Sequence, residues 1–414
     1  MNFDINKIPH INEIANNGSF NGARKNTETF QQRCRDCNKI VPSLEEAIKK
    51  SGLRDGMTIS FHHHFRNGDH IINNVLDKLA EMGFKNLTLA ASSLSAVHAP
   101  LIEHIRSGLI THIETSGLRG ELAEQISRGL MDFPVVFRSH GGRASAIRSG
   151  ELHIDVAFLG APSCDPYGNA NGYSRDDDDG ISCGSLGYAR TDAEFADKVI
   201  IITNNIVSYP NAPWAIPEHD VDYVVRVDDI GDPKGIMSGA TRYTKDPKEL
   251  LIAKTAANVV EAAGYLYDGF SMQMGSGGAS LATARFIRQK MLDKGIRCRF
   301  ALGGITGQIT AMHEEGLIDR ILDVQSFDLD AAKSLKNNHF HHQISATYYA
   351  SHLVATAAEQ LDFVILSALE IDTDFNVNVL TGSDGVIRGA IGGHPDTAES
   401  ASLAVIVAPL VRGR

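Results

Sequence analysis

The sequence predicts an α/β protein made of two related α/β domains with largely parallel sheets. Three observations support this fold class. Short apolar runs such as residues 363–366 do not alternate with polar residues, which is typical of strands buried on both faces of a parallel sheet. Amphipathic helical patterns alternate with these runs along the chain. The same order of strand, loop, helix and strand then occurs twice, roughly 200 residues apart.

The first half opens with a capping-box pattern at residues 43–46, which predicts a helix start. A strand is expected over residues 57–61, followed by a histidine-rich loop over 62–69. An amphipathic helix comes next, and a second strand is expected over residues 86–91. The apolar face of that helix contains Ile71, Ile72, Val75, Leu76, Leu79 and Met82.

The second half repeats this order after a second Asp-Gly pair. A strand is expected over residues 270–274, followed by a glycine-rich loop over 275–280 and a helix over 281–292. Residues 155–159 align in the same way with residues 362–366. Duplication of this kind places two similar clefts face to face.

These patterns divide the chain into three parts. Residues 1–42 are polar and are predicted to form an N-terminal arm. Residues 43–230 are predicted to form the first domain, and residues 231–414 the second domain, which carries Glu370. The boundary falls in residues 229–248, which are rich in Gly, Asp, Pro and Lys.

Composition excludes several classes of function. Asp and Glu (50) outnumber Lys and Arg (39), the net charge is −11, and no basic block is present, so no nucleic-acid partner is expected. The N-terminus lacks the apolar core of a signal peptide, and the apolar run 403–411 is too short to span a bilayer. Five cysteines form an odd, sparse set that suits a reducing compartment. We therefore expect a cytoplasmic protein without a membrane segment.

Metal binding is considered at three places and is not expected at any of them. Cys34 and Cys37 form a lone C-x-x-C without a second pair. His62 and His64 spell the H-x-H that metal hydrolases use on barrel folds, but the two-fold repeat argues against a barrel. The acidic stretch 175–179 is interpreted as a solvated loop, because adjacent carboxylates repel one another.

Glu370 is the leading candidate for a catalytic side chain. It follows the apolar run 363–366, at the carboxyl end of a predicted strand, where ligands bind in open α/β sheets. In the alignment of the two halves it takes the place of Ser163, so the halves differ at this point. Asn376 and Asn378 follow it and are expected to contact the substrate.

A glycine-rich loop supplies the second part of the predicted site. Gly275, Gly277 and Gly278 stand between a strand and a helix, where backbone N–H groups can approach a ligand and the helix N-terminus favours negative charge. A dinucleotide site is the alternative, but Ser280 replaces the third glycine of that fingerprint. An oxyanion hole for acyl transfer fits better, since it needs only N–H groups aimed at one point.

The first half supplies candidates for binding an anionic substrate. His63 and Arg66 lie in the histidine-rich loop, and Arg119 is a further cation. A second group could cradle a carboxylate, and it consists of Ser139, His140, Gly141, Gly142 and Arg143. A carboxylate facing an oxyanion hole suggests acyl transfer without a serine or cysteine triad. Attack by a carboxylate on a thioester gives a mixed anhydride, which a thiol can then reopen.

Several long sequence segments resemble the citrate lyase alpha subunit family, whose members are citrate CoA-transferases. The resemblance extends from about residue 41 to residue 414. The segments are residues 55–63, 116–120, 139–143, 155–160, 300–306, 322–327 and 367–389. The resemblance implies two CoA-transferase-like α/β domains. It also implies a reaction in which an acetyl thioester and citrate give a citryl thioester and acetate.

The resemblance also implies substrates, partners and site residues. The thioester would be acetyl-CoA or the CoA-like prosthetic group of an acyl-carrier (gamma) subunit, and a beta subunit would cleave the citryl thioester. A homo-oligomer is expected as well. In related CoA-transferases a glutamate resembling Glu370 attacks the thioester, and a loop resembling residues 275–278 forms the oxyanion site. The citrate branch is expected instead to use direct attack by a citrate carboxylate, with Glu370 as a base or an orienting group.

Two departures from the family pattern accompany the resemblance. The acidic stretch 175–179 resembles an insertion, and chains of this family continue beyond Arg414, so the second domain is expected to be truncated at its C-terminal end. Three alternatives to a citrate CoA-transferase stay open. They are a CoA-transferase for a related acid such as citramalate, a non-catalytic CoA-transferase-like sensor or scaffold, and a metal hydrolase that uses His62 and His64.

Overall fold

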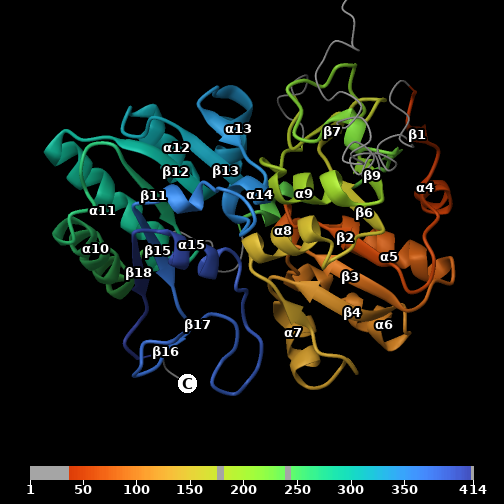
Figure 1. Cartoon of the computed structure of the whole chain (residues 1–414), viewed down its shortest axis with the longest axis horizontal. Coiled ribbons are helices and arrows are strands. Elements are labelled where there is room, and N and C mark those ends of the chain that lie inside the picture. Colours follow the sequence, from red (N-terminus) through yellow and green to blue (C-terminus); the bar gives the residue numbers. More distant parts are fainter. Residues whose placement is uncertain (1–36, 175–180, 238–243, 412–414) are drawn as a thin grey trace, which may run out of the picture.

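The structure, a computed structural model, describes residues 37–174, 181–237 and 244–411. These residues form two α/β halves that lie side by side, and each half is built on its own large sheet (Figure 1). Every strand pair within the two large sheets is parallel. The predicted fold class, two α/β domains with largely parallel sheets, is therefore confirmed.

The first half contains an eight-stranded sheet. In spatial order its strands are β1 (Ile40–Val41), β10 (Tyr223–Arg226), β9 (Lys198–Thr203), β6 (Val156–Gly160), β2 (Thr58–Phe61), β3 (Leu87–Ala91), β4 (Ile110–Thr115) and β5 (Val136–Phe137). Every residue of β6 is buried, as expected for a central strand of a parallel sheet. Ile40 and Val41, the last apolar residues of the predicted arm, pair with β10 at the sheet edge. Residues 1–36 of that arm lie outside the described residues.

Six α-helices of the described residues flank this sheet. They are α4 (Leu44–Ser51), α5 (Ile71–Glu81), α6 (Leu101–Arg106), α7 (Gly120–Ser127), α8 (His140–Ser149) and α9 (Gly187–Phe195). The predicted helix start is confirmed, because Ser43 Oγ accepts a hydrogen bond from the Glu46 amide at 3.2 Å. The apolar face predicted for α5 is buried from Ile71 to Leu79. The acidic stretch 175–179 lies outside the described residues.

The second half contains a six-stranded sheet. Its strands, in spatial order, are β14 (His341–Gln343), β13 (Ile321–Ser326), β12 (Cys298–Ile305), β11 (Phe270–Met274), β15 (Phe363–Ser367) and β18 (Leu403–Val407). Its helices are α10 (Pro247–Ala262), α11 (Gly278–Lys294), α12 (Gly307–Glu314), α13 (Leu329–Asn337), α14 (Ala346–Ala350) and α15 (His394–Ser400). The helix predicted over residues 281–292 is thus longer at both ends, and it stops at Gly295, whose φ of 65° suits a glycine C-cap.

The internal repeat extends to a small hairpin that follows a central strand in each half. In the first half β7 (Ser163–Cys164) pairs with β8 (Ala170–Asn171), and in the second half β16 (Glu370–Ile371) pairs with β17 (Val377–Asn378). The two registers correspond, since Ser163 faces Asn171 and Glu370 faces Asn378. The alignment of Glu370 with Ser163 is therefore correct.

Two large apolar cores lie on the two sides of the predicted domain boundary. One contains buried residues from Val41 to Ile236, and the other contains buried residues from Ala256 to Val407. Residues 231–236, assigned to the second domain from the sequence, pack on the first half, because the Asp232 amide donates to Gly68 O at 2.8 Å and Ile236 is fully buried there. A third, smaller cluster contains Tyr188 of the first half and residues of the second half, so it joins the two.

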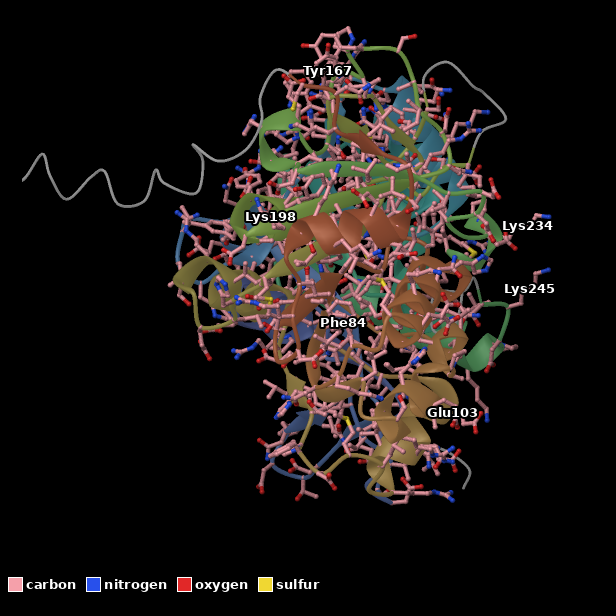
Figure 2. The ribbon with its side chains drawn as sticks, turned by 90° about the vertical axis from the view of Figure 1, so that its right-hand side faces the viewer. Phe84, Glu103, Tyr167, Lys198, Lys234 and Lys245 are labelled. Carbon is pink, nitrogen blue, oxygen red and sulfur yellow. The ribbon has the colours of Figure 1, made fainter. Side chains whose placement is uncertain are left out.

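Charged side chains of both signs project from the described part of the chain (Figure 2). Figure 2 shows the molecule turned by 90°, and Glu103, Lys198 and Lys234 lie at separate places around its outline. Within the described part of the chain, no helix combines the length and the apolar character that a membrane crossing requires.

Candidate functional site

A cavity of about 500 Å³ lies between the two halves. Its lining residues follow the carboxyl ends of β2, β3 and β4 in the first half and of β11, β13 and β15 in the second half. The two sheets therefore present their ligand-binding ends to the same space, as the duplication predicts. Of the residues predicted to form the site, the lining includes His63, Arg66, His140, Gly275, Gly277 and Gly278.

Two arginines of the first half give the cavity a positive wall. Arg66 lies over the ring of Phe327 at 4.9 Å, and Arg119 Nη1 donates to Ser93 Oγ at 3.5 Å. Burial, together with the charge of Arg119, lowers the pKa of Arg66 to about 10, so its guanidinium stays charged at neutral pH. Among the described residues no carboxylate forms an ion pair with Arg119. A partly buried cation without a carboxylate partner is suited to an anionic ligand.

The histidines of the cavity are neutral at physiological pH. His63 Nδ1 lies 2.5 Å from Ser92 Oγ, and burial holds the pKa of His63 well below its ordinary value. Burial and the neighbouring charges of Arg143 and Arg119 lower the pKa of His140 to about 3. These side chains therefore contribute polar ring nitrogens and apolar surface rather than positive charge.

His62 and His64 lie outside the cavity lining, and their rings are in contact at an interplanar angle of 47°, with the centroids 3.8 Å apart. Within the described residues, the three-member group whose ligand atoms could share a metal ion is His153, Asp155 and Asp197, which includes neither histidine. The structure therefore gives no support to the hydrolase alternative.

The buried state of His62 leads to a prediction about stability. Burial lowers the pKa of His62 to about 4, whereas the unfolded chain has an ordinary value near 6.5. Between these values the unfolded state binds a proton that the folded state excludes. We therefore expect the free energy of unfolding to fall as pH is lowered through this window, by up to about 1.4 kcal/mol per pH unit.

Urea unfolding between about pH 7 and about pH 5 measures this dependence. In the variant His62→Gln, the pH dependence of the free energy of unfolding should be smaller by about one proton. A slope equal to that of the unchanged protein would contradict the prediction.

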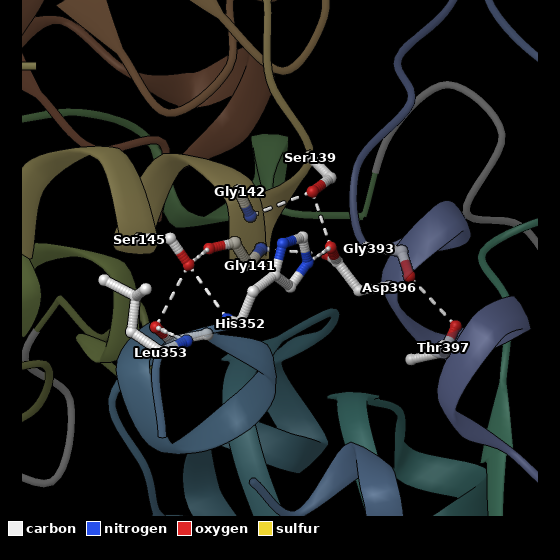
Figure 3. A network of polar contacts seen from close by, with 10 residues as sticks. Ser139, Gly141, Gly142, Ser145, His352, Leu353, Gly393, Asp396 and Thr397 are labelled. Carbon is white, nitrogen blue, oxygen red and sulfur yellow. Dashed lines mark hydrogen bonds and ion pairs between the residues drawn. The ribbon is translucent and has the colours of Figure 1, made fainter. Parts of the chain in front are cut away.

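The segment predicted to cradle a substrate carboxylate binds a carboxylate of the chain itself (Figure 3). Ser139 Oγ donates to Asp396 Oδ1 at 2.5 Å, and the Gly141 amide donates to Asp396 Oδ2 at 2.8 Å. The Gly142 amide donates to Ser139 Oγ at 2.9 Å, which caps α8. The chemistry expected of this helix N-terminus is present, but Asp396 of α15 takes the place assigned to the substrate.

Arg143 also binds groups of the protein itself. Its Nη1 and Nη2 donate to the two carboxylate oxygens of Asp192 at 2.6 and 2.8 Å, and Nη2 also donates to Ala90 O at 3.0 Å. Arg143 is buried and does not line the cavity. Its predicted role in substrate binding is therefore replaced by a structural one, and His140 is the residue of this segment that reaches the cavity.

The glycine loop offers N–H groups at the start of α11. The Gly275 amide is already bonded to Ile365 O at 2.7 Å, so it is not available to a ligand. Gly277 and Gly278 stand at the N-cap and the first position of α11, where backbone amides have no acceptor within the helix. A Cβ at Gly277 would lie 2.1 Å from Ser367 Oγ, and a Cβ at Gly278 would lie 2.7 Å from Glu249 Oε2. Close packing thus requires glycine at position 277, where Ser367 Cβ would also lie 2.8 Å away, whereas at position 278 the contact is with the end of a flexible side chain.

Glu370 is not among the residues that line the cavity. It lies in the β16–β17 hairpin, where Ser383 Oγ donates to its Oε1 at 2.6 Å and Asn378 Nδ2 donates to its Oε2 at 3.1 Å. These two hydrogen bonds lower the pKa of Glu370, so it is ionised at neutral pH. Asn376 donates to Asp372 within the hairpin loop at 2.8 Å. The three predicted residues of this segment therefore bond within the hairpin and its neighbouring loop, and none of them is among the lining residues.

Sequence reasoning missed part of the lining. The crossing segment (residues 379–393) leaves the hairpin and binds the first half, because the Leu118 amide donates to Gly389 O and the Ile391 amide donates to Ser116 O. Tyr188, at the start of α9, also lines the cavity. No local pattern marks either feature, since both depend on contacts between the two halves.

The comparisons with known proteins agree on one family. The family model for the citrate lyase alpha subunit matches residues 37–414. The citrate lyase alpha chain of Haemophilus influenzae is 60% identical over 389 residues, covering 94% of this chain and 77% of that protein. The Escherichia coli citrate lyase alpha chain is 58% identical, covering 94% of this chain and 75% of that protein.

Solved structures agree with this result. A crystal structure of a citrate lyase alpha subunit from Streptococcus mutans, in complex with citrate, has a TM-score of 0.87 at 56% identity and covers 92% of this chain and 74% of that one. A Pseudomonas malonate decarboxylase hetero-tetramer in complex with malonate shares the fold, with a TM-score of 0.66 at 16% identity, over 91% of this chain and 69% of that one. The chain therefore belongs to the citrate lyase alpha subunit family, the citrate CoA-transferase component of that enzyme.

Proposed function

We propose that the cavity between the halves binds citrate and an acetyl thioester together, and exchanges acetyl for citryl on the thiol. The observation that carries this proposal is that the cavity has cations on one side and helix N-terminal amides on the opposite side. Arg66 and Arg119 line the first-half side, and the amides of Gly277 and Gly278 line the second-half side. Cations suit the carboxylates of the acid, and helix N-terminal amides suit the oxyanion of an acyl-transfer intermediate. The citrate ligand of the Streptococcus mutans relative supports the choice of acid.

In the proposed mechanism a citrate carboxylate attacks the thioester directly. A bond forms between a carboxylate oxygen and the acetyl carbonyl carbon, and the carbon–sulfur bond breaks. The thiolate departs, and the product of this step is a mixed anhydride of acetate and citrate. The thiolate then attacks the citryl carbonyl of this anhydride, and acetate leaves. The amides at the start of α11 stabilise the oxyanion in both steps. We prefer this route to attack by Glu370, because that carboxylate is bonded to Ser383 and Asn378 outside the cavity.

The wider context follows the family. The chain is a component of a multisubunit citrate lyase. We propose that its partners are the beta (citryl lyase) subunit and the gamma (acyl carrier) subunit, whose CoA-like prosthetic group supplies the thioester, and that free acetyl-CoA can replace it. A cytoplasmic location and a homo-oligomeric state stay predictions. No observation favours citramalate as the acid or a non-catalytic scaffold.

Acyl exchange with purified protein tests the proposed function. Acetyl-CoA and citrate should give citryl-CoA and acetate, which mass spectrometry and an acetate assay detect separately. Parallel assays with citramalate, malonate and propane-1,2,3-tricarboxylate show which acid the protein accepts. Absence of a citryl thioester, in protein that binds citrate, would reject the transferase proposal for this chain.

The direct route leads to a prediction for Glu370. The variant Glu370→Gln is expected to keep the transfer rate within about threefold, because surface changes of this kind are worth only about 0.5 kcal/mol. Initial rates of acetate release at saturating citrate check this. A folded variant that has lost more than about 100-fold would instead give Glu370 the role of a base or nucleophile.

A further inference from the structure

Tyr188 is held at the junction of the two halves by close packing. It follows Gly187, where a Cβ would lie 2.3 Å from Ile344 O and 2.6 Å from Val324 O. The first turn of α9 is therefore pressed against the second half, with no room for a side chain at Gly187. Tyr188 itself is only 5% exposed, and it belongs to the apolar cluster that joins the halves.

Two histidine rings fix the orientation of the tyrosine ring. The His63 ring stacks on it with a centroid distance of 5.0 Å and an interplanar angle of 23°. The His140 ring lies 4.3 Å from it. Because burial keeps both imidazoles neutral, they act as apolar plates at neutral pH. The tyrosine ring thus has little freedom to move.

The hydroxyl of Tyr188 has no hydrogen-bond partner among the described residues, although the side chain is buried and lines the cavity. Tyr349, a second buried tyrosine of the lining, differs in this respect, since Gln273 Nε2 donates to its hydroxyl at 3.0 Å. The Tyr188 hydroxyl oxygen is not among the fully buried polar atoms of the described residues that lack a partner, so it is accessible from the cavity and can bond to a ligand atom there.

We propose that the Tyr188 hydroxyl donates a hydrogen bond to a carboxylate oxygen of the acceptor acid, and so helps to select that acid. This inference rests on the proposed function and names a further binding residue of the same site. Arg66 and Tyr188 both line the cavity, so the two donors face the same space. Burial raises the pKa of Tyr188 well above its ordinary value, so the hydroxyl keeps its proton. A neutral donor beside a guanidinium fixes the orientation of a carboxylate without adding charge.

The variant Tyr188→Phe tests the proposal, because it removes the hydroxyl and keeps the ring between the two histidines. A hydrogen bond to a charged group is worth about 1.5–3 kcal/mol, so we expect the KM for citrate to rise about tenfold or more. The KM for acetyl-CoA should stay within about twofold. Calorimetric titration with citrate alone, without thioester, should show the same loss of affinity. Tyr173→Phe is the matched control, since Tyr173 is 4% exposed and does not line the cavity.

Each outcome decides the proposal. An unchanged citrate affinity in folded Tyr188→Phe overturns it, and so does an effect confined to acetyl-CoA, which would place the hydroxyl at the thioester. If the unchanged protein fails to bind citrate, the proposed function fails as well. If the variant does not fold, unchanged protein with 13C-labelled tyrosine rings gives the answer. Citrate should shift a tyrosine signal that acetyl-CoA leaves in place, and no shift overturns the inference.

Discussion

Replacing Arg119 by methionine is expected to lower kcat/KM for citrate by about 100-fold or more. Truncating one partner of a buried, hydrogen-bonded charge pair costs about 2–5 kcal/mol, and Arg119 is a largely buried cation of the cavity wall that no described carboxylate neutralises. Methionine keeps much of the apolar stem, so the packing of the wall is largely preserved. Steady-state kinetics with citrate varied at saturating acetyl-CoA measure the effect.

Arg128 provides the matched control. It stands at the C-cap of α7, whereas Arg119 stands at the N-cap of the same helix, and its exposed guanidinium pairs with Glu124 on the surface. The variant Arg128→Met should keep its rate within about threefold. Equal kinetics for the two variants would remove Arg119 from the citrate site.

The variant Gly141→Ala is expected to lower the free energy of unfolding by more than about 3 kcal/mol. A Cβ at Gly141 would lie 1.9 Å from Ala350 O and 2.7 Å from Ala350 C, which are backbone atoms of the second half. Backbone cannot turn aside as a flexible side chain can. The substitution therefore pushes α8 away from α14 and stretches the hydrogen bond from the Gly141 amide to Asp396.

Urea denaturation followed by circular dichroism measures this loss. Gly142→Ala is the neighbouring comparison, because its Cβ would meet Ser139 Oγ at 2.9 Å, a side-chain atom that can rotate. A clearly smaller loss is expected there. Equal stabilities of the Gly141 and Gly142 variants would show that α8 and the second half are not packed as closely as the structure has them.

The fold could be predicted because its signals are local and occur twice. The apolar runs gave the buried strands, the capping box at Ser43 gave the start of α4, and the repeat gave two sheets that face each other. Even the correspondence of Glu370 with Ser163 holds at the level of strand register. These features depend on residues close together in the chain, or on comparing one half with the other.

The site could be predicted only in part, because its remaining features depend on distant partners. Arg143 has the chemistry of a carboxylate binder, but Asp192, which it binds, lies 49 residues away. The carboxylate bound by Ser139 belongs to Asp396, which is 257 residues further on. Neither separation leaves a pattern in a single sequence. Glu370 is a related case, since its partners Ser383 and Asn378 depend on how the hairpin packs, and its catalytic role stays a prediction.

The crossing segment limits how the two halves can move. Its backbone is hydrogen-bonded to Leu118, Ser116 and His140 of the first half. Spreading the halves would break several of these bonds at once and expose the apolar cluster between them. Reactants are therefore expected to enter and leave the cavity while the two halves stay joined. An acyl donor carried on a long, narrow arm suits a cavity whose two halves stay joined.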